Sequence, residues 1–174
     1  MRALWILTCL LLATACAGTP KRPEGAPSRV VVVGASVVPR PAPRGLVGDV
    51  FGGEEPREVV AREGAEALRS RGFEVVGMEM TVGPSPTVEE ATALARQYRA
   101  DAAVVLVLTR LDLSALQPLG QAEVRMDVMM VDPTGQVLAS ESRQSTTAET
   151  LYRSQTNWRS HVRQAVIQAV RTLP

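Results

Sequence analysis

Histidine and cysteine are nearly absent from this chain of 174 residues, which has one histidine, His161, and two cysteines, Cys9 and Cys16. A protein zinc site takes several ligands from these two residue types, so the composition argues against one. A Ser–His–Asp hydrolase would have to use His161, and the chain has no GxSxG serine elbow. We expect His161 to lie partly solvated on a helix, and we predict no catalytic residue and no metal ligand.

Aromatic residues and an excess of one charge are also missing. Aromatic residues make up 3% of the chain, so the core must be built of Val, Leu, Ala and Met. The 19 basic residues nearly balance the 18 acidic ones, and the formal net charge is +1. This balance gives no basic surface for phosphates, and we expect no nucleic-acid partner.

The apolar run near the amino terminus, residues 3–15, is too short to span a membrane as a helix, which needs about 20 residues. One basic residue, Arg2, precedes the run, and the small residues Ala13, Thr14 and Ala15 end it. This arrangement is typical of a secretory signal. We therefore predict that residues 1–15 are a signal peptide.

Cys16 directly follows those small residues, and the sequence ATAC resembles the lipobox of bacterial lipoproteins. The resemblance implies that Cys16 carries a diacylglycerol and an amino-terminal acyl chain, which are the only bound groups we expect. Two or three acyl chains hold a protein firmly on a membrane. Ala17, where an aspartate often signals inner-membrane retention, favours the periplasmic face of the outer membrane. The alternative is an ordinary signal peptide with an incidental cysteine.

The next residues, 16–28, are rich in proline, glycine and small polar residues and have no apolar periodicity. Such a composition is typical of a flexible tether. Residues 29–174 are of ordinary size for one domain, and we predict a single one.

Apolar patterning within 29–174 predicts an alternation of strands and helices. We predict strands at 30–38, 73–80, 102–113 and 121–131, and a fifth strand from 136 that is joined by the hairpin Asp132-Pro133-Thr134-Gly135. We predict helices between Pro56 and Gly72, after the capping box Thr87–Glu90, and from Trp158 to the carboxyl terminus.

The order β-α-β-α-β-β-β-α indicates an α/β (α+β) fold with a mixed sheet. Strand 102–113 is the most apolar and should be central. Strand 121–131 alternates apolar with polar residues, which predicts one wet face. We therefore expect the helices to lie mainly on the other face. The polar strand face is usually solvated surface, and the alternative is a contact patch.

The sequence VVVVGAS, residues 30–36, resembles the first strand of a nucleotide-binding enzyme. A dinucleotide site needs further glycines at fixed positions and a helix that starts at once. Here the strand continues after Gly34, and the chain has no GxxxxGK[ST] motif. We therefore expect no nucleotide cofactor.

The loop 39–55 is rich in proline and glycine and also holds four apolar residues. Apolar residues in a loop dock either onto a partner or onto their own domain. We name these residues as a candidate partner-binding loop: Leu46, Val47, Val50 and Phe51.

The chain resembles a superfamily of envelope lipoproteins that includes the curli secretion channel lipoprotein, the LpoB-type activator of peptidoglycan synthases and the amino-terminal domain of TolB. The resemblance lies in the Val-rich first strand, the long loop, and the sequences LRSRGFEVV, ARQYRADAAVVLVLT and VDPTGQVLAS. Where the family has a Gly-Ala-Asp turn, this chain has Arg99-Ala100-Asp101.

This resemblance implies a non-catalytic module that assembles with an envelope complex, such as a cell-wall synthase, a secretion apparatus or a transport complex. Two other hypotheses stay open. One is a periplasmic binder of a small ligand or glycan that uses loop 39–55 as a lid. The other is an envelope hydrolase that uses His161.

Overall fold

The computed structural model describes residues 25–41, 53–81, 85–115, 121–148 and 158–174. The described strands are β1 (Arg29–Ser36), β2 (Glu74–Met80), β3 (Ala102–Asp112), β4 (Gln121–Val131) and β5 (Val137–Ala148). The described helices are α2 (Pro56–Ser70), α3 (Val88–Gln97) and α5 (Trp158–Val170). The predicted element order and the α/β (α+β) class are confirmed.

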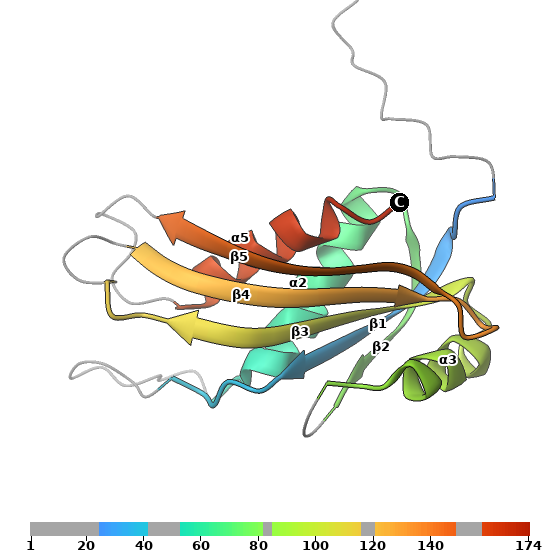
Figure 1. Ribbon diagram of the computed structural model, residues 1–174, viewed down its shortest axis with the longest axis horizontal. Coiled ribbons are helices and arrows are strands. Elements are labelled where there is room, and N and C mark those ends of the chain that lie inside the picture. Colours follow the sequence, from blue (N-terminus) through green and yellow to red (C-terminus); the bar gives the residue numbers. More distant parts are fainter. Residues whose placement is uncertain (1–24, 42–52, 82–84, 116–120, 149–157) are drawn as a thin grey trace, which may run out of the picture.

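The strands form one mixed sheet in the order β2-β1-β3-β4-β5 (Figure 1). Strand β1 pairs in parallel with β2 and β3, whereas β3, β4 and β5 pair antiparallel. The most apolar strand, β3, is central, as predicted. Strand β1 ends at Ser36 and not at Val38, because the Ser36 hydroxyl donates to the Val38 carbonyl and accepts from its N–H.

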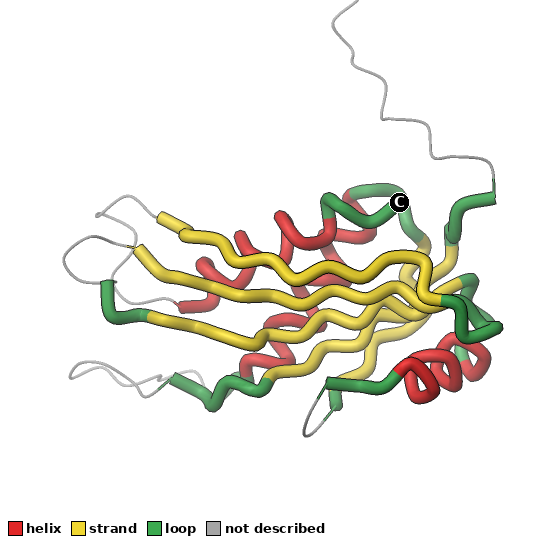
Figure 2. The backbone as a smooth tube through the Cα atoms, in the orientation of Figure 1, coloured by secondary structure: helices red, strands yellow, loops and turns green. Residues whose placement is uncertain are grey.

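Helices cover the two faces of the sheet unequally. Helices α2 and α5 pack on one face against Val30, Leu106 and Met126 and their neighbours. Helix α3 packs on the opposite face, where Ala91 and Ala95 contact a smaller core around Val31 and Val105. Figure 2 shows α2 and α5 behind the strands and α3 at one end of the sheet. The expectation that the helices lie mainly on one face is confirmed.

Gly34 in the Val-rich first strand serves helix packing. A Cβ atom at this position would lie 2.5 Å from the Arg57 carbonyl oxygen and 2.6 Å from the Ala61 Cβ. Both Arg57 and Ala61 belong to α2, so the missing side chain lets this helix approach β1 closely. The glycine that resembles a phosphate-binding turn is therefore a helix–strand contact.

The helix boundaries follow their local signals. Pro56 occupies the first turn of α2, where its missing N–H costs no hydrogen bond. The Thr87 hydroxyl accepts from the Glu90 N–H, and the Glu90 carboxylate accepts from the Thr87 N–H, as predicted for a capping box. Gly72 takes φ +82° after α2, and Arg99 takes φ +50° after α3.

Candidate functional site: the open face of the sheet

The predicted lipidation site and the candidate partner-binding loop lie outside the part of the chain that the structure describes. Cys16 belongs to residues 1–24, and the loop residues Leu46, Val47, Val50 and Phe51 belong to residues 42–52. The far end of the loop is described at Glu54. Its carboxylate pairs with Arg62 of α2 and, at 3.0 Å, with Arg159 of α5. The described end of the loop is therefore held by ion pairs to two helices.

Strand β4 separates a buried side from a wet side. Ala122, Val124, Met126, Val128 and Met130 are at most 3% exposed beneath α5. The residues between them point to the side of α3, which does not reach over most of β4 and β5. We call this surface the open face: Glu123, Arg125, Asp127 and Met129 of β4, with their cross-strand partners Thr146, Gln144, Ser142 and Ser140 of β5.

Polar side chains on the open face are bonded to one another in a ladder. The Arg125 guanidinium donates to the Gln144 Oε1 at 2.7 Å, and the Gln144 amide donates to the Glu123 carboxylate at 2.9 Å. At the next step the Ser142 hydroxyl donates to Asp127 at 2.6 Å. These groups are exposed, so each bond contributes little stability. The bonds instead hold acidic and basic side chains in fixed positions on the surface.

The ladder continues onto the end of β3. Arg110 lies 3.3 Å from the Asp112 carboxylate and 3.4 Å from the Glu123 carboxylate. The backbone N–H of Ser114 donates to Asp112, and this bond is the main reason why the pKa of the Asp112 carboxyl is lowered. Asp112 is therefore an anion at neutral pH. Through Arg110, which also pairs with Glu123, it connects the end of β3 to the open face.

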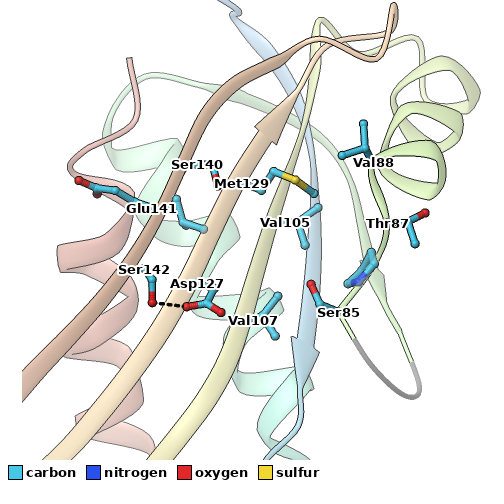
Figure 3. Close-up of a pocket in the computed structure, with 12 residues that line it drawn as sticks. Ser85, Thr87, Val88, Val105, Val107, Asp127, Met129, Ser140, Glu141 and Ser142 are labelled. Carbon is cyan, nitrogen blue, oxygen red and sulfur yellow. Dashed lines mark hydrogen bonds between the residues drawn. The ribbon is translucent and has the colours of Figure 1, made fainter.

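A groove of about 430 Å³ crosses the open face beside α3. Figure 3 shows Ser85, Thr87 and Val88 on one side of it and Ser140 and Ser142 on the other. Its floor is apolar and comes from Val105, Val107 and Met129. Asp127 and Glu141 are the acidic residues that line it, and Ser142 holds the Asp127 carboxylate at the rim. An apolar floor with hydroxyl and carboxylate groups at the rim suits a partner's side chain or a small polar ligand.

His161 does not lie partly solvated, and that expectation is wrong. Its side chain is 0% exposed within the α5 face of the core, and its Nδ1 lies 2.7 Å from the Thr147 hydroxyl oxygen. The same hydroxyl bonds to the Ala122 carbonyl at 3.2 Å. The histidine thus connects α5 to β5 and β4. A general base must reach the proton that it removes, and burial withholds His161 from a substrate, which counts against the hydrolase hypothesis.

Other acidic side chains of the described residues have structural roles. Glu55 and Glu58 form a capping box at the start of α2, and Glu89 and Glu90 lie in the first turn of α3. No group of three or more His, Cys, Asp or Glu within the described residues could hold a metal ion. In the same part of the chain, every helix is too short or too polar to cross a membrane.

Sequence reasoning identified the wet face of β4 but not the groove. The alternation in residues 121–131 shows that Asp127 faces away from the core. It does not show that Ser142 pairs with Asp127, or that residues 85–88 border the same surface. The groove depends on where α3 packs, which is decided by contacts between segments far apart in the sequence.

No protein-family model matches the chain, and no curated protein matches its sequence. Among solved structures, a PelC dodecamer subunit from Paraburkholderia phytofirmans matches with a TM-score of 0.50 and 16% identity over 82% of this chain and 84% of that chain. Lipoprotein GNA1162 from Neisseria meningitidis matches with a TM-score of 0.40 and 15% identity over 83% and 99%. The LpoB C-terminal domain from Salmonella enterica matches with a TM-score of 0.35 and 13% identity over 73% and 87%. By the first of these matches, the chain shares the fold of the PelC subunit.

Proposed function

We propose that this chain is a non-catalytic accessory protein of a bacterial envelope complex and that it contacts a partner protein through the open face. In this proposal the domain is anchored by lipids on Cys16 to the periplasmic face of the outer membrane. Residues 16–28 serve as the tether between the lipid and the domain. The complex would belong to cell-wall synthesis, secretion or transport.

The open face is the observation that carries this proposal. It joins an apolar groove floor to a surrounding ring of polar and charged groups, which is the composition of a non-obligate protein interface. Its polar groups are already bonded to one another, so little further side-chain freedom would be lost on binding. The shared fold with the PelC subunit is compatible with a role in an assembly.

The non-catalytic part of the proposal rests on the placement of His161. The residue that a hydrolase would need is fully buried and bonded to Thr147. We therefore expect a His161→Leu variant to be less stable while keeping its partner wherever it remains folded. Loss of an envelope activity in folded His161→Leu protein would instead favour the hydrolase hypothesis.

In-cell photo-crosslinking tests the open face directly. A photo-reactive amino acid is placed at Arg125 or Ser142 of the full chain, and matched controls carry it at the exposed residues Glu66 and Arg69 of α2. We expect a defined set of crosslinked envelope proteins from the open-face positions and not from the α2 positions. Equal products from both surfaces, or none from either, would contradict the proposal.

Lipidation of Cys16 and the role of the loop need separate variants. A clickable fatty acid should label the parent chain and not Cys16→Ser, and the Cys16→Ser chain should leave the membrane fraction.

A second variant replaces Leu46, Val47, Val50 and Phe51 with serine. If the loop contributes to the partner contact, this variant should reduce the open-face crosslinks without changing the thermal unfolding temperature.

A second candidate function is the binding of a small ligand or glycan, and the groove favours it. Asp127 and Ser142 could bond the hydroxyl groups of a sugar while Val107 and Met129 contact its apolar side. Thermal unfolding with muropeptides tests this alternative. A ligand-dependent stabilisation that Asp127→Ala removes would support it, and unchanged unfolding temperatures would count against it.

A further inference from the structure

Strand β5 has an exposed edge. It is 12 residues long, longer than any other strand of the sheet, and within the described residues it pairs only with β4. Natural edge strands are usually protected by short length, proline, lysine or a bulge. Residues 138–148 contain no proline and no lysine, and the one register irregularity of this pair lies at the start of β5. Within the described residues, this edge of β5 carries the charged residues Glu141 and Arg143 but no proline, lysine or central bulge, and it is a candidate surface for pairing with another strand.

Charges near the middle of β5 indicate which strand would pair there. Glu141 and Arg143 point to the same side of the strand and form an ion pair at 3.0 Å. Their side chains are 44% and 45% exposed. Ser142 lies between them. The residues one position before and one position after Ser142 therefore carry opposite charges.

We propose that β5 pairs antiparallel with β5 of a second copy of this chain, about a two-fold axis at Ser142. In this register Glu141 of each copy lies directly opposite Arg143 of the other copy. The four charged groups then alternate in sign on one side of the joined strands. Opposite charges placed directly across a strand pair stabilise it, and like charges destabilise it.

The neighbouring registers lack this complementarity. A two-fold axis at Glu141 would place the two glutamates opposite each other, and an axis at Arg143 would do the same to the arginines. With the axis at Ser142, Ser140 lies opposite Gln144, and Leu138 lies opposite Thr146, so no other charges oppose. The charge pattern of one strand thus selects one self-complementary arrangement, as a two-fold interface requires.

The resulting dimer has one continuous sheet of two copies. Its axis is perpendicular to the sheet, so α2 and α5 of both copies lie on one side and both open faces lie on the other. Pairing uses the strand edge and leaves the open face accessible. The dimer therefore extends the proposed function without depending on it, because an envelope partner and a second copy would occupy different surfaces.

Charge exchange at Glu141 and Arg143 tests the dimer in the full chain, purified in detergent micelles and measured by sedimentation equilibrium. Replacing Glu141 with arginine places like charges opposite each other twice. We expect Glu141→Arg to raise the dimer dissociation constant by about tenfold or more. The double variant Glu141→Arg/Arg143→Glu should restore it. If circular dichroism shows that Glu141→Arg is unfolded, Arg143→Glu alone serves as the second single variant.

A cysteine pair gives an independent readout in cells. Ser142→Cys should form a disulfide between two copies in the oxidising envelope, visible as a dimer on a non-reducing gel. Arg69→Cys on α2 and the parent chain are the controls, and the parent also reports any dimer made through Cys16. A monomeric parent chain, or a dimer that both single charge variants leave unchanged, would overturn the proposal. A larger oligomer insensitive to these charges would also overturn it.

Discussion

The Asp101 carboxylate accepts a hydrogen bond of 2.8 Å from the backbone N–H of Arg29, although the two residues are 72 positions apart. The N–H and hydroxyl of Ser28 donate to the same oxygen, each at 2.9 Å. Asp101 lies at the start of β3, and Ser28 and Arg29 lie at the start of β1. One carboxylate thus fixes the point at which the predicted tether ends and the folded domain begins.

Asp101 should stabilise the domain at neutral pH and lose that effect in acid. The N–H of Arg29 first, and then that of Ser28, hold the pKa of the Asp101 carboxyl below its usual value. A lowered pKa in the folded state means that the contribution is present above the usual range of an aspartate and is lost as the pH falls through the folded value. Because Asp101 is exposed and water screens its bonds, we expect Asp101→Asn to lower the free energy of unfolding at pH 7 by about 0.5–1 kcal/mol.

Urea unfolding of the two chains across a pH series measures this difference. The difference in unfolding free energy between Asp101→Asn and the parent should disappear in acid, because protonation of Asp101 removes the same charge from the parent. Glu66→Gln on the exposed side of α2 is the control and should show no such difference. A difference that stays constant down to acid pH would mean that the carboxylate charge has no part in it.

The Gly34 contact with α2 predicts a marked loss of stability on adding one methyl group. Gly34→Ala would force the helix away from β1, because the nearest atom is a backbone carbonyl oxygen that cannot rotate aside. We expect the free energy of unfolding to fall by about 1–3 kcal/mol. The second-site change Ala61→Gly removes the Ala61 Cβ, one of three close contacts, and should recover only a small part of the loss, because the Arg57 carbonyl oxygen and the Ala61 backbone nitrogen at 2.7 Å stay in place. Full tolerance of Gly34→Ala in denaturant unfolding would contradict this packing.

The Thr147–His161 bond predicts an energetic coupling between β5 and α5. Both side chains are buried, at 2% and 0% exposure, so replacing Thr147 with valine removes a polar partner inside the core. We expect Thr147→Val to cost about 1–3 kcal/mol of unfolding free energy. A double-mutant cycle with His161→Leu should give a coupling of about 1 kcal/mol. Additive effects would show that the two side chains act independently.

Arg99 predicts a substitution that stabilises the protein. Its φ of +50° lies in the left-handed region, which costs an ordinary side chain roughly 1–2 kcal/mol and glycine almost nothing. After allowing for the greater freedom of glycine in the unfolded chain, Arg99→Gly should raise the free energy of unfolding by about 0.5–1 kcal/mol. Gly72 has a φ of +82°, so the opposite substitution, Gly72→Arg, should lower the free energy of unfolding by a similar amount. Thermal unfolding of both variants beside the parent checks the two opposite signs.

Local patterns explain why much of the fold could be predicted. The alternation in residues 121–131, the capping box at Thr87 and Glu90, and the hairpin Gly135 at φ +96° all act within a few residues. Such patterns determine which residues form a strand, a helix or a turn, and which side of it is apolar. The order of the elements and the central place of β3 then follow from the unbroken apolar sequence of β1 and β3.

The functional surfaces could not be predicted in the same way, because they join distant segments. His161 has the same helical spacing whether it faces water or the core, and only the packing of α5 on β4 and β5 buries it. The sequence after Gly34 argues against a nucleotide site, but only the packing of α2 on β1 shows why this position lacks a side chain.

By itself, the sequence determined the apolar faces, the turns and the order of the elements, because these depend on side-chain periodicity over short distances. Tertiary structure decided that α3 does not reach over most of β4 and β5, that Asp127 meets Ser142, and that β5 pairs only with β4 among the residues that the structure describes. Each of these depends on which long-range contacts exclude the most water, and no short stretch of sequence contains that information.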